Sequence, residues 1–255
     1  MTGSNIEATL DGRWALVTGA AKRIGAVIAS TLHDAGANVA IHYHRSAADA
    51  EQLAADLNRR RPKSAFTVAA DMLDIADIER MAADVVKRIG SNKLDVLVNN
   101  ASSFYPTPLG TVTPEQWQDL MGSNLKAPLF LSQALLPALR AARGVIINIV
   151  DVHAQRPLRD HPVYGAAKAG LAMLTRSLAK DLGPDVRVNG VSPGAILWPD
   201  EGMTEPLRAA IVKQTALKRT GEPQDVARTV LFLVRDAPYI TGQIIAVDGG
   251  RSVGW

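Results

Sequence analysis

The sequence has no cysteine and few aromatic residues, and neither sign of charge dominates it. Without cysteine, disulfide bonds, a thiol nucleophile and a thiolate metal site are excluded. With 28 Lys and Arg against 25 Asp and Glu, the net charge is only +3. Because the basic excess is small and no interleaved aromatic and basic residues occur, a nucleic-acid binder is the weakest interpretation.

Long apolar runs are also missing. None approaches the roughly 20 residues that a bilayer-spanning helix needs. The first residues, MTGSNIEATLDGR, lack the apolar core of a secretory signal. We therefore expect a cytoplasmic protein with no membrane partner. A chain of 255 residues is long enough to bury the core of one large α/β domain.

Short apolar runs alternate with longer segments of helical periodicity. The apolar runs predict strands at 14–19, 37–43, 64–70, 94–100, 144–150, 186–194 and 243–250. The periodic segments predict helices at about 22–35, 46–60, 74–90, 113–124, 127–142, 161–183 and 223–236. This order favours right-handed βαβ units and a parallel sheet with helices on both faces. We predict an α/β fold in which residues 1–255 form one doubly wound domain after a tail at 1–12.

The first predicted strand leads into TGAAKRIG, residues 18–25, at the start of a helix. In such sheets, phosphates bind against helix N-termini and close backbone amides. Gly19 and Gly25 suit that approach, although glycine spacing alone fits an ordinary strand–helix turn equally well. Arg23 stands where a middle glycine is usual. Its guanidinium could contact a pyrophosphate and still face the substrate.

The second predicted strand ends in IHYHRS, residues 41–46, with no acid to accept from a ribose 2′-hydroxyl. His44, Arg45 and Ser46 instead offer a charge and donors for a 2′-phosphate. The alternative is an exposed polar loop. We therefore expect NADPH to be preferred over NADH.

Three further side chains are candidates for proton chemistry. Tyr164 and Lys168 are four residues apart on a predicted helix, so they share one face, and the ammonium should lower the pKa of the phenol. Asp151 precedes Tyr164 by thirteen residues, and Asn124 is a candidate to hold a water that links the lysine to solvent. Taken singly, each has a structural alternative, such as a surface pair, a helix cap or a helix kink.

Together, TGAAKRIG, NNA at 99–101, Asn124, Tyr164-x-x-x-Lys168 and PG at 193–194 resemble the short-chain dehydrogenase/reductase superfamily over nearly the whole chain. That resemblance implies a seven-stranded Rossmann sheet, a nicotinamide cofactor and usually a homotetramer. Four departures are similar to the pteridine reductases, which reduce oxidised pterins, dihydropterins and often folates with NADPH. They are KR within the glycine loop, HYHRS, NNASSFYPTPL at 99–109, and Asp151 in place of the usual serine.

The resemblance implies three sets of site residues. The catalytic residues are Asn124, Asp151, Tyr164 and Lys168. The NADPH-binding residues are Gly19, Arg23, Ile24, Gly25, Tyr43, His44, Arg45, Ser46, Asp71, Met72, Asn100, Ala101, Ser102, Tyr164, Lys168, Pro193, Gly194 and Ile196. The substrate-binding residues are Arg23, Ser102, Phe104, Asp151, Tyr164, Leu197 and Trp198. No metal is expected, because His153 and His161 lack paired ligand spacing.

The chemistry of a pterin matches these residue types. A flat heterocycle can stack between the nicotinamide and Phe104, with Ser102 at its polar edge. Hydride addition to a C=N bond needs a proton at nitrogen, which Asp151 paired with Tyr164 can relay. Residues 198–214 are expected to form a substrate lid, with Trp198 as a pocket wall or as packing. The C-terminus could reach a neighbouring subunit's site through Arg251 or Trp255.

Two other functions stay open. One is a carbonyl or 3-oxoacyl reductase, which would favour serine at position 151. The other is a non-catalytic Rossmann module that senses NADP and regulates a partner. Such a module tends to lose the tyrosine or the lysine, and both Tyr164 and Lys168 are present here.

Overall fold

The computed structural model describes residues 9–198 and 204–253. Most of the predicted tail at 1–12 and part of the predicted lid at 198–214 therefore lie outside the described residues, as does Trp255.

Seven parallel strands form one sheet in the order β3-β2-β1-β4-β5-β6-β7. Their bounds are β1 Trp14–Val17, β2 Asn38–Tyr43, β3 Ala65–Ala69, β4 Val96–Asn99, β5 Val145–Ile149, β6 Arg187–Pro193 and β7 Ile244–Val247. The strand order reverses between β1 and β4, which pair in parallel. In an open parallel sheet, that reversal opens a crevice at the carboxyl ends of the strands, where ligands bind.

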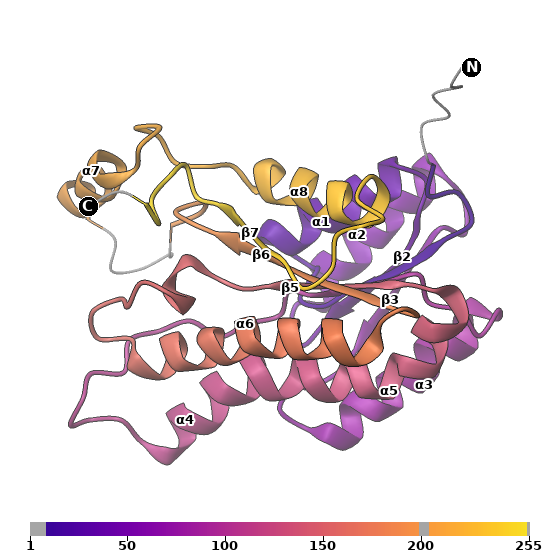
Figure 1. Cartoon of the computed structure of the whole chain (residues 1–255). Coiled ribbons are helices and arrows are strands. Elements are labelled where there is room, and N and C mark those ends of the chain that lie inside the picture. The colour runs from indigo at the N-terminus through magenta and orange to yellow at the C-terminus, as the bar shows by residue number, and fades with distance from the viewer. Residues whose placement is uncertain (1–8, 199–203, 254–255) are drawn as a thin grey trace.

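Helices cover both faces of the sheet (Figure 1). Helices α1, α2 and α8 lie above it in that view, and α3, α5 and α6 lie below it. The helix bounds are α1 Arg23–Asp34, α2 Ala47–Arg60, α3 Ile75–Ile89, α4 Pro114–Met121, α5 Ala127–Ala142, α6 Pro162–Leu182, α7 Glu205–Gln214 and α8 Pro223–Arg235. The predicted α/β fold, a doubly wound sheet with helices on both faces, is confirmed.

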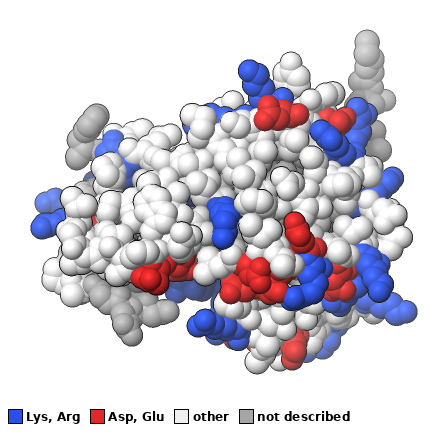
Figure 2. All heavy atoms as spheres, turned by 90° about the horizontal axis from the view of Figure 1, so that it is seen from below, with Lys and Arg blue, Asp and Glu red and all other residues white. Residues whose placement is uncertain are grey.

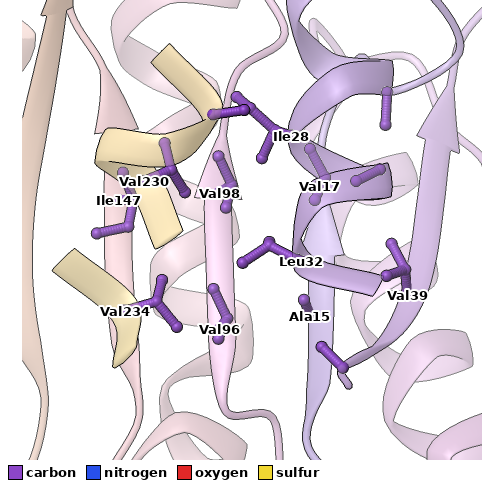
Figure 3. Packing of buried hydrophobic residues seen from close by; sticks show 14 of the residues in the cluster. Ala15, Val17, Ile28, Leu32, Val39, Val96, Val98, Ile147, Val230 and Val234 are labelled. Atoms are coloured by element: carbon purple, nitrogen blue, oxygen red, sulfur yellow. The ribbon is translucent and has the colours of Figure 1, made fainter. Parts of the chain in front are cut away.

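Two apolar cores explain why the strand runs are apolar without alternation. Val17 and Val98 pack into the core beneath α1 and α8, whereas Leu16 and Leu97 pack into the core on the α3 and α5 side. Figure 3 shows the first of these cores, with side chains of α1 and α8 over the strands, among them Ile28, Leu32, Val230 and Val234. Because each fully buried aliphatic side chain contributes about 1.5–3 kcal/mol, these two layers hold the sheet rigid beneath the crevice.

Three local features differ from the sequence-based expectations. Helix α7 lies in the segment that was expected to form a substrate lid and for which no helix was predicted, and Pro206 stands within its first turn. A π-helix, η1 (Gly122–Lys126), joins α4 to α5. A 3₁₀ turn, η2 (Val152–Ala154), begins directly after Asp151. The last two features border the crevice, where π-helical turns often mark functional sites.

The surface carries both signs of charge. On the face seen from below in Figure 2, blue and red side chains alternate around a broad uncharged area. No large area of blue side chains alone covers that face. Within the described residues, none of the helices has the length and apolarity required to cross a membrane.

Candidate active site

The loop after β1 is built for close backbone packing. Gly19 has φ of +60°, and a Cβ there would lie 2.9 Å from Cα of Ala101. A Cβ on Gly25 would lie 2.3 Å from the carbonyl oxygen of Gly19 and 2.6 Å from Nδ2 of Asn100. Nδ2 of Asn100 donates to the carbonyls of Thr18, at 2.9 Å, and Gly19, at 3.1 Å. The NNA segment after β4 therefore holds the glycine loop in place.

His42, near the end of β2, holds the same loop from the other side. Its Nδ1 accepts from the backbone N–H of Gly19 at 3.0 Å, and its Nε2 lies 3.1 Å from the carbonyl oxygen of Ala70. The two partners fix the tautomer, because Nδ1 must be unprotonated and Nε2 must donate. Burial is the main cause that lowers the pKa of His42 to about 4. Sequence reasoning did not single out His42, although a polar residue within an apolar strand needs a partner and so gave a signal.

The first turns of α1 and α2 offer amides at the crevice. The side chains of the two N-cap residues, Lys22 of α1 and Ser46 of α2, make no capping hydrogen bond. Uncapped first-turn amides are the groups that bind phosphates at helix N-termini. The side chain of Ile24 packs against the core, so the first turn of α1 is anchored from beneath. These features fit a dinucleotide whose phosphates lie at the two helix starts.

Several of the predicted NADPH-binding residues lie at the ends of β2 and β3. Tyr43 is partly buried at the end of β2, while His44 and Arg45 are exposed beyond it. Asp71 follows β3, and its Oδ2 lies 4.0 Å from Nε2 of His44. Met72, the next residue, is buried. The structure thus brings these predicted cofactor residues to one rim of the crevice.

The three predicted proton-handling residues meet where β5 ends beside α6. The hydroxyl of Tyr164 donates to Oδ2 of Asp151 at 2.8 Å, and Oδ1 of Asp151 accepts the backbone N–H of His153 at 2.8 Å. Lys168 is buried, and its Nζ donates to the carbonyl oxygen of Ile149 at 2.9 Å. Asp151 is therefore oriented by two donors, and its carboxyl group faces the phenol.

The prediction that the Lys168 ammonium lowers the pKa of Tyr164 is wrong. Burial, followed by the charge and hydrogen bond of Asp151, raises the pKa of Tyr164 well above its ordinary value. Lys168 does not offset this, because its Nζ lies 5.7 Å from the centre of the tyrosine ring and bonds to a carbonyl. Burial also lowers the pKa of Lys168 to about 8, an effect that the charge of Asp151 opposes. Tyr164 thus keeps its proton at neutral pH and acts toward Asp151 as a donor.

Asn124 lies in the π-helical turn η1. Its Nδ2 donates to the carbonyls of Ser103, at 2.9 Å, and Leu120, at 3.0 Å, while its buried Oδ1 has no described partner. A buried acceptor without a partner is a place where a water can bind. The side chain thus ties the loop after β4 to the helix turn, and its role in holding a water stays a prediction.

An aromatic wall stands beside Tyr164. The ring of Phe104 is 43% exposed, stacks on His161 with centroids 4.8 Å apart and 18° between planes, and meets Tyr164 edge-on at 4.8 Å. Nδ1 of His161 lies 2.7 Å from the carbonyl oxygen of Arg159, which leaves Nε2 for other contacts. Ser102 is exposed two residues before Phe104. Sequence reasoning considered His161 only as a possible metal ligand and gave it no part in this wall.

The segment after β6 closes the other side of the crevice. Pro193 ends β6, and a Cβ on Gly194 would lie 2.7 Å from Cβ of Asp248. Ile196 is buried, whereas Leu197 is 38% exposed. This segment therefore packs closely on the end of β7 before it turns outward.

Arg23 connects the glycine loop to this segment. It begins α1 with φ of +54°, and its Nη2 donates to the carbonyl oxygen of Trp198 at 3.1 Å. The guanidinium of Arg208, in α7, lies 5.8 Å from the centre of the Trp198 indole ring. Through Arg23, the glycine loop thus contacts Trp198, the first residue of the predicted lid.

Arg251, near the C-terminus, lies close to the site of its own chain. Burial lowers the pKa of its guanidinium, while the charges of Asp151 and Asp248 oppose that effect. Ser252 and Asp151 line one small cavity of about 60 Å³ beside α6.

Comparisons with known proteins agree with this arrangement. Residues 19–252 match the family model described as enoyl-(acyl carrier protein) reductase. The chain is 41% identical over 280 residues to pteridine reductase 1 of Leishmania tarentolae, which covers 94% of this chain and 96% of that protein. It is 37% identical over 240 residues to a 3-oxoacyl-[acyl-carrier-protein] reductase of Staphylococcus aureus, with 92% and 96% covered. The corresponding Staphylococcus epidermidis protein is 36% identical, with 92% and 97% covered.

The doubly wound parallel sheet, the glycine loop at its topological switch and the Tyr164–Lys168 helix thus occur in a chain that matches this family over most of its length. The protein belongs to the short-chain dehydrogenase/reductase family and is an oxidoreductase.

Proposed function

We propose that this oxidoreductase is an NADPH-dependent pteridine reductase that reduces dihydropterins or oxidised pterins, with dihydrofolate as a further substrate. The observation that carries the proposal is the 2.8 Å hydrogen bond between the Tyr164 hydroxyl and the Asp151 carboxyl group, beside the exposed ring of Phe104. A carboxyl group can deliver a proton to a ring nitrogen, which a serine hydroxyl does poorly.

The glycine loop, the first turns of α1 and α2 and the His44–Ser46 segment would hold NADPH, which supplies the hydride. Phe104 and His161 provide a flat wall against which a heteroaromatic ring can stack. Asp151, in its acid form, gives its proton to the ring nitrogen while the neighbouring carbon receives the hydride, so that C=N becomes CH–NH. As Asp151 releases its proton, the Tyr164 hydroxyl passes one to it along their hydrogen bond while a solvent proton replaces it, so that no free tyrosinate forms. The substrate gains one hydride and one proton, and Tyr164 is reprotonated from solvent.

The main rival is an NADPH-dependent carbonyl or 3-oxoacyl reductase, which the identities to the staphylococcal enzymes favour. A ketone needs its proton at oxygen, and a hydroxyl donor suffices to bind that oxygen. Asp151 weighs against this rival, which would favour a serine hydroxyl at that position to bind the substrate carbonyl.

A substrate panel tests the proposal. Purified protein with NADPH is offered 7,8-dihydrobiopterin, dihydrofolate, a 3-oxoacyl thioester and a simple ketone, and oxidation of NADPH is followed by its absorbance. Turnover of the pterin or the folate supports the proposal. Turnover of the ketone or thioester alone overturns it in favour of the rival, and NADPH binding without any turnover supports the sensing module.

We also propose that the chain forms a homotetramer in the cytoplasm. Apolar side chains are exposed on helices of both faces, including Leu129 on α5, Met173 on α6 and Phe232 on α8. Exposed apolar residues on two faces are what a subunit with two interfaces would present. Light scattering coupled to gel filtration tests this, and a monomer at micromolar concentration would contradict it.

A further inference from the structure

The loop after β4 presents alternate side chains to opposite sides. Ser102 and Phe104 are exposed, whereas Ser103 and Tyr105 are partly buried. Tyr105 packs with Leu120 of α4 in a small apolar cluster. One side of the loop therefore faces the crevice, and the other rests on α4.

A single carboxylate on α4 binds the loop on each side of Phe104. Oδ1 of Asp119 accepts the Ser103 hydroxyl at 3.0 Å, and Oδ2 accepts the Tyr105 hydroxyl at 2.8 Å. Hydrogen bonds to an ionised acceptor are stronger than those between neutral groups. Burial and the contact with Asp119 raise the pKa of Tyr105 to about 12, so that this hydroxyl stays a donor. Both neighbours of Phe104 are thus fixed to the same group.

Phe104 itself has few constraints of its own. Its ring is 43% exposed and touches the rings of His161 and Tyr164 along one side. An exposed ring loses its position when its backbone moves, because little packing restores it. The position of the ring relative to Tyr164 is therefore set by the backbone on either side, which Asp119 holds.

Hydrogen bonds also fix Asp119 on its own helix and connect it to the π-helical turn η1, which contains Asn124. Helix α4 begins with a capping box between Thr113 and Gln116. The Ser123 hydroxyl donates to the Asp119 carbonyl at 2.8 Å and accepts the backbone N–H of Ser103 at 3.2 Å. A network in which every member has a partner holds one arrangement of the loop.

We propose that Asp119 is a positioning residue that holds the Phe104 ring beside Tyr164 through Ser103 and Tyr105, and thereby sets how the substrate ring stacks. The proposal rests on the proposed function, since it requires a flat substrate against Phe104. No role for Asp119 in proton transfer is implied, because its two carboxylate oxygens accept from the Ser103 and Tyr105 hydroxyls.

The test separates positioning from general stabilisation. In Asp119→Asn, one amide oxygen still accepts a hydroxyl, while the amide nitrogen cannot accept the other. We expect KM for 7,8-dihydrobiopterin to rise about tenfold, the upper value of an aromatic contact, while the Kd of NADPH changes less than about twofold. Tyr105→Phe removes one anchor and should raise KM by a smaller factor in the same direction. Glu115→Gln, an exposed carboxylate on the same helix, is the matched control and should leave both constants unchanged.

A double-mutant cycle with Phe104→Ala gives the decisive reading. If Asp119 acts through the ring, Asp119→Asn should raise KM less than about twofold once Phe104 is alanine. An equal effect in both backgrounds, or an equal loss of NADPH affinity, would overturn the proposal. Should Asp119→Asn fail to fold, the cycle is run with Tyr105→Phe and read in the same way.

Failure of the proposed function is distinguishable from failure of this inference. If the wild-type protein reduces only a thioester or ketone, the pterin proposal has failed and the cycle is repeated with that substrate. Coupling between Asp119 and Phe104 there would support the positioning of the Phe104 ring, and only its part in stacking a flat substrate would fall with the pterin proposal. Additive effects there would overturn it.

Discussion

Acidification should destabilise this protein through His42, and the structure gives the size of the effect. His42 is neutral and buried, with its Nδ1 accepting from Gly19 and its Nε2 donating to Ala70. A proton added to Nδ1 would face the N–H of Gly19, so the folded protein resists protonation. The pKa of His42 falls from its ordinary 6.5 to about 4 in the folded chain.

The sign follows from proton binding. Between these two pKa values the unfolded chain binds a proton that the folded chain refuses, so stability is fully present above pH 6.5 and is lost as pH falls toward 4. At pH 5 the loss relative to pH 8 is about 2 kcal/mol, which is a large part of the usual stability of a domain. Burial also lowers the pKa of His33, which acts in the same direction. Because both histidines contribute to the pH dependence of stability, His42 is tested by comparing variants rather than by the total change in the wild type.

The assay is urea unfolding at pH 8 and pH 5 for wild type, His42→Asn and His44→Asn. His42→Asn should be less stable than wild type at pH 8, because it loses buried hydrogen bonds. Its further loss between pH 8 and pH 5 should be smaller than that of wild type by about 2 kcal/mol. His44→Asn removes an exposed histidine whose charge is the smallest of the named causes that shift the pKa of His42, and it should keep most of the wild-type pH dependence. The reasoning is refuted if His42→Asn loses as much stability on acidification as wild type does.

Three other predictions, one of them with a control variant, have defined outcomes. Gly25→Ala should weaken NADPH binding about tenfold or more, because its Cβ would overlap the carbonyl oxygen of Gly19. Gly165→Ala is the control: its Cβ would meet nothing nearer than 3.6 Å, so it should not lower the melting temperature by more than a few degrees. Arg45→Ala should lower kcat/KM with NADPH about 10–100-fold and leave that with NADH unchanged, and equal losses with both cofactors would contradict the assignment. Tyr164→Phe should lower kcat about 10²–10⁴-fold with NADPH affinity retained, and an unchanged kcat would remove the phenol from proton transfer.

The sequence was informative about the fold because local rules decide it. Strands buried on both faces must be apolar throughout, and βαβ connections have one handedness, so the seven apolar runs and their spacing predict the sheet. Helix α7 was not predicted, because Glu205–Gln214 is largely exposed and lacks a strong apolar face.

The candidate site was only partly predictable. Asp151 and Tyr164 were paired in advance because they resemble a family pattern, and their hydrogen bond is a feature of the structure. The raised pKa of Tyr164 was missed, because it depends on burial and on where the Lys168 ammonium points. Asp119 was missed too, since nothing in the sequence says which hydroxyls its carboxylate will accept. Such long-range partners are chosen by tertiary packing rather than by sequence spacing.

The most direct test of the account is to replace Asp151 by serine, the residue that most of the family has there. The account predicts that Asp151→Ser lowers kcat/KM for 7,8-dihydrobiopterin about 100-fold or more, as the loss of a general acid does, while NADPH binds as before. Undiminished pterin reduction by Asp151→Ser would contradict the claim that this carboxyl group delivers the proton.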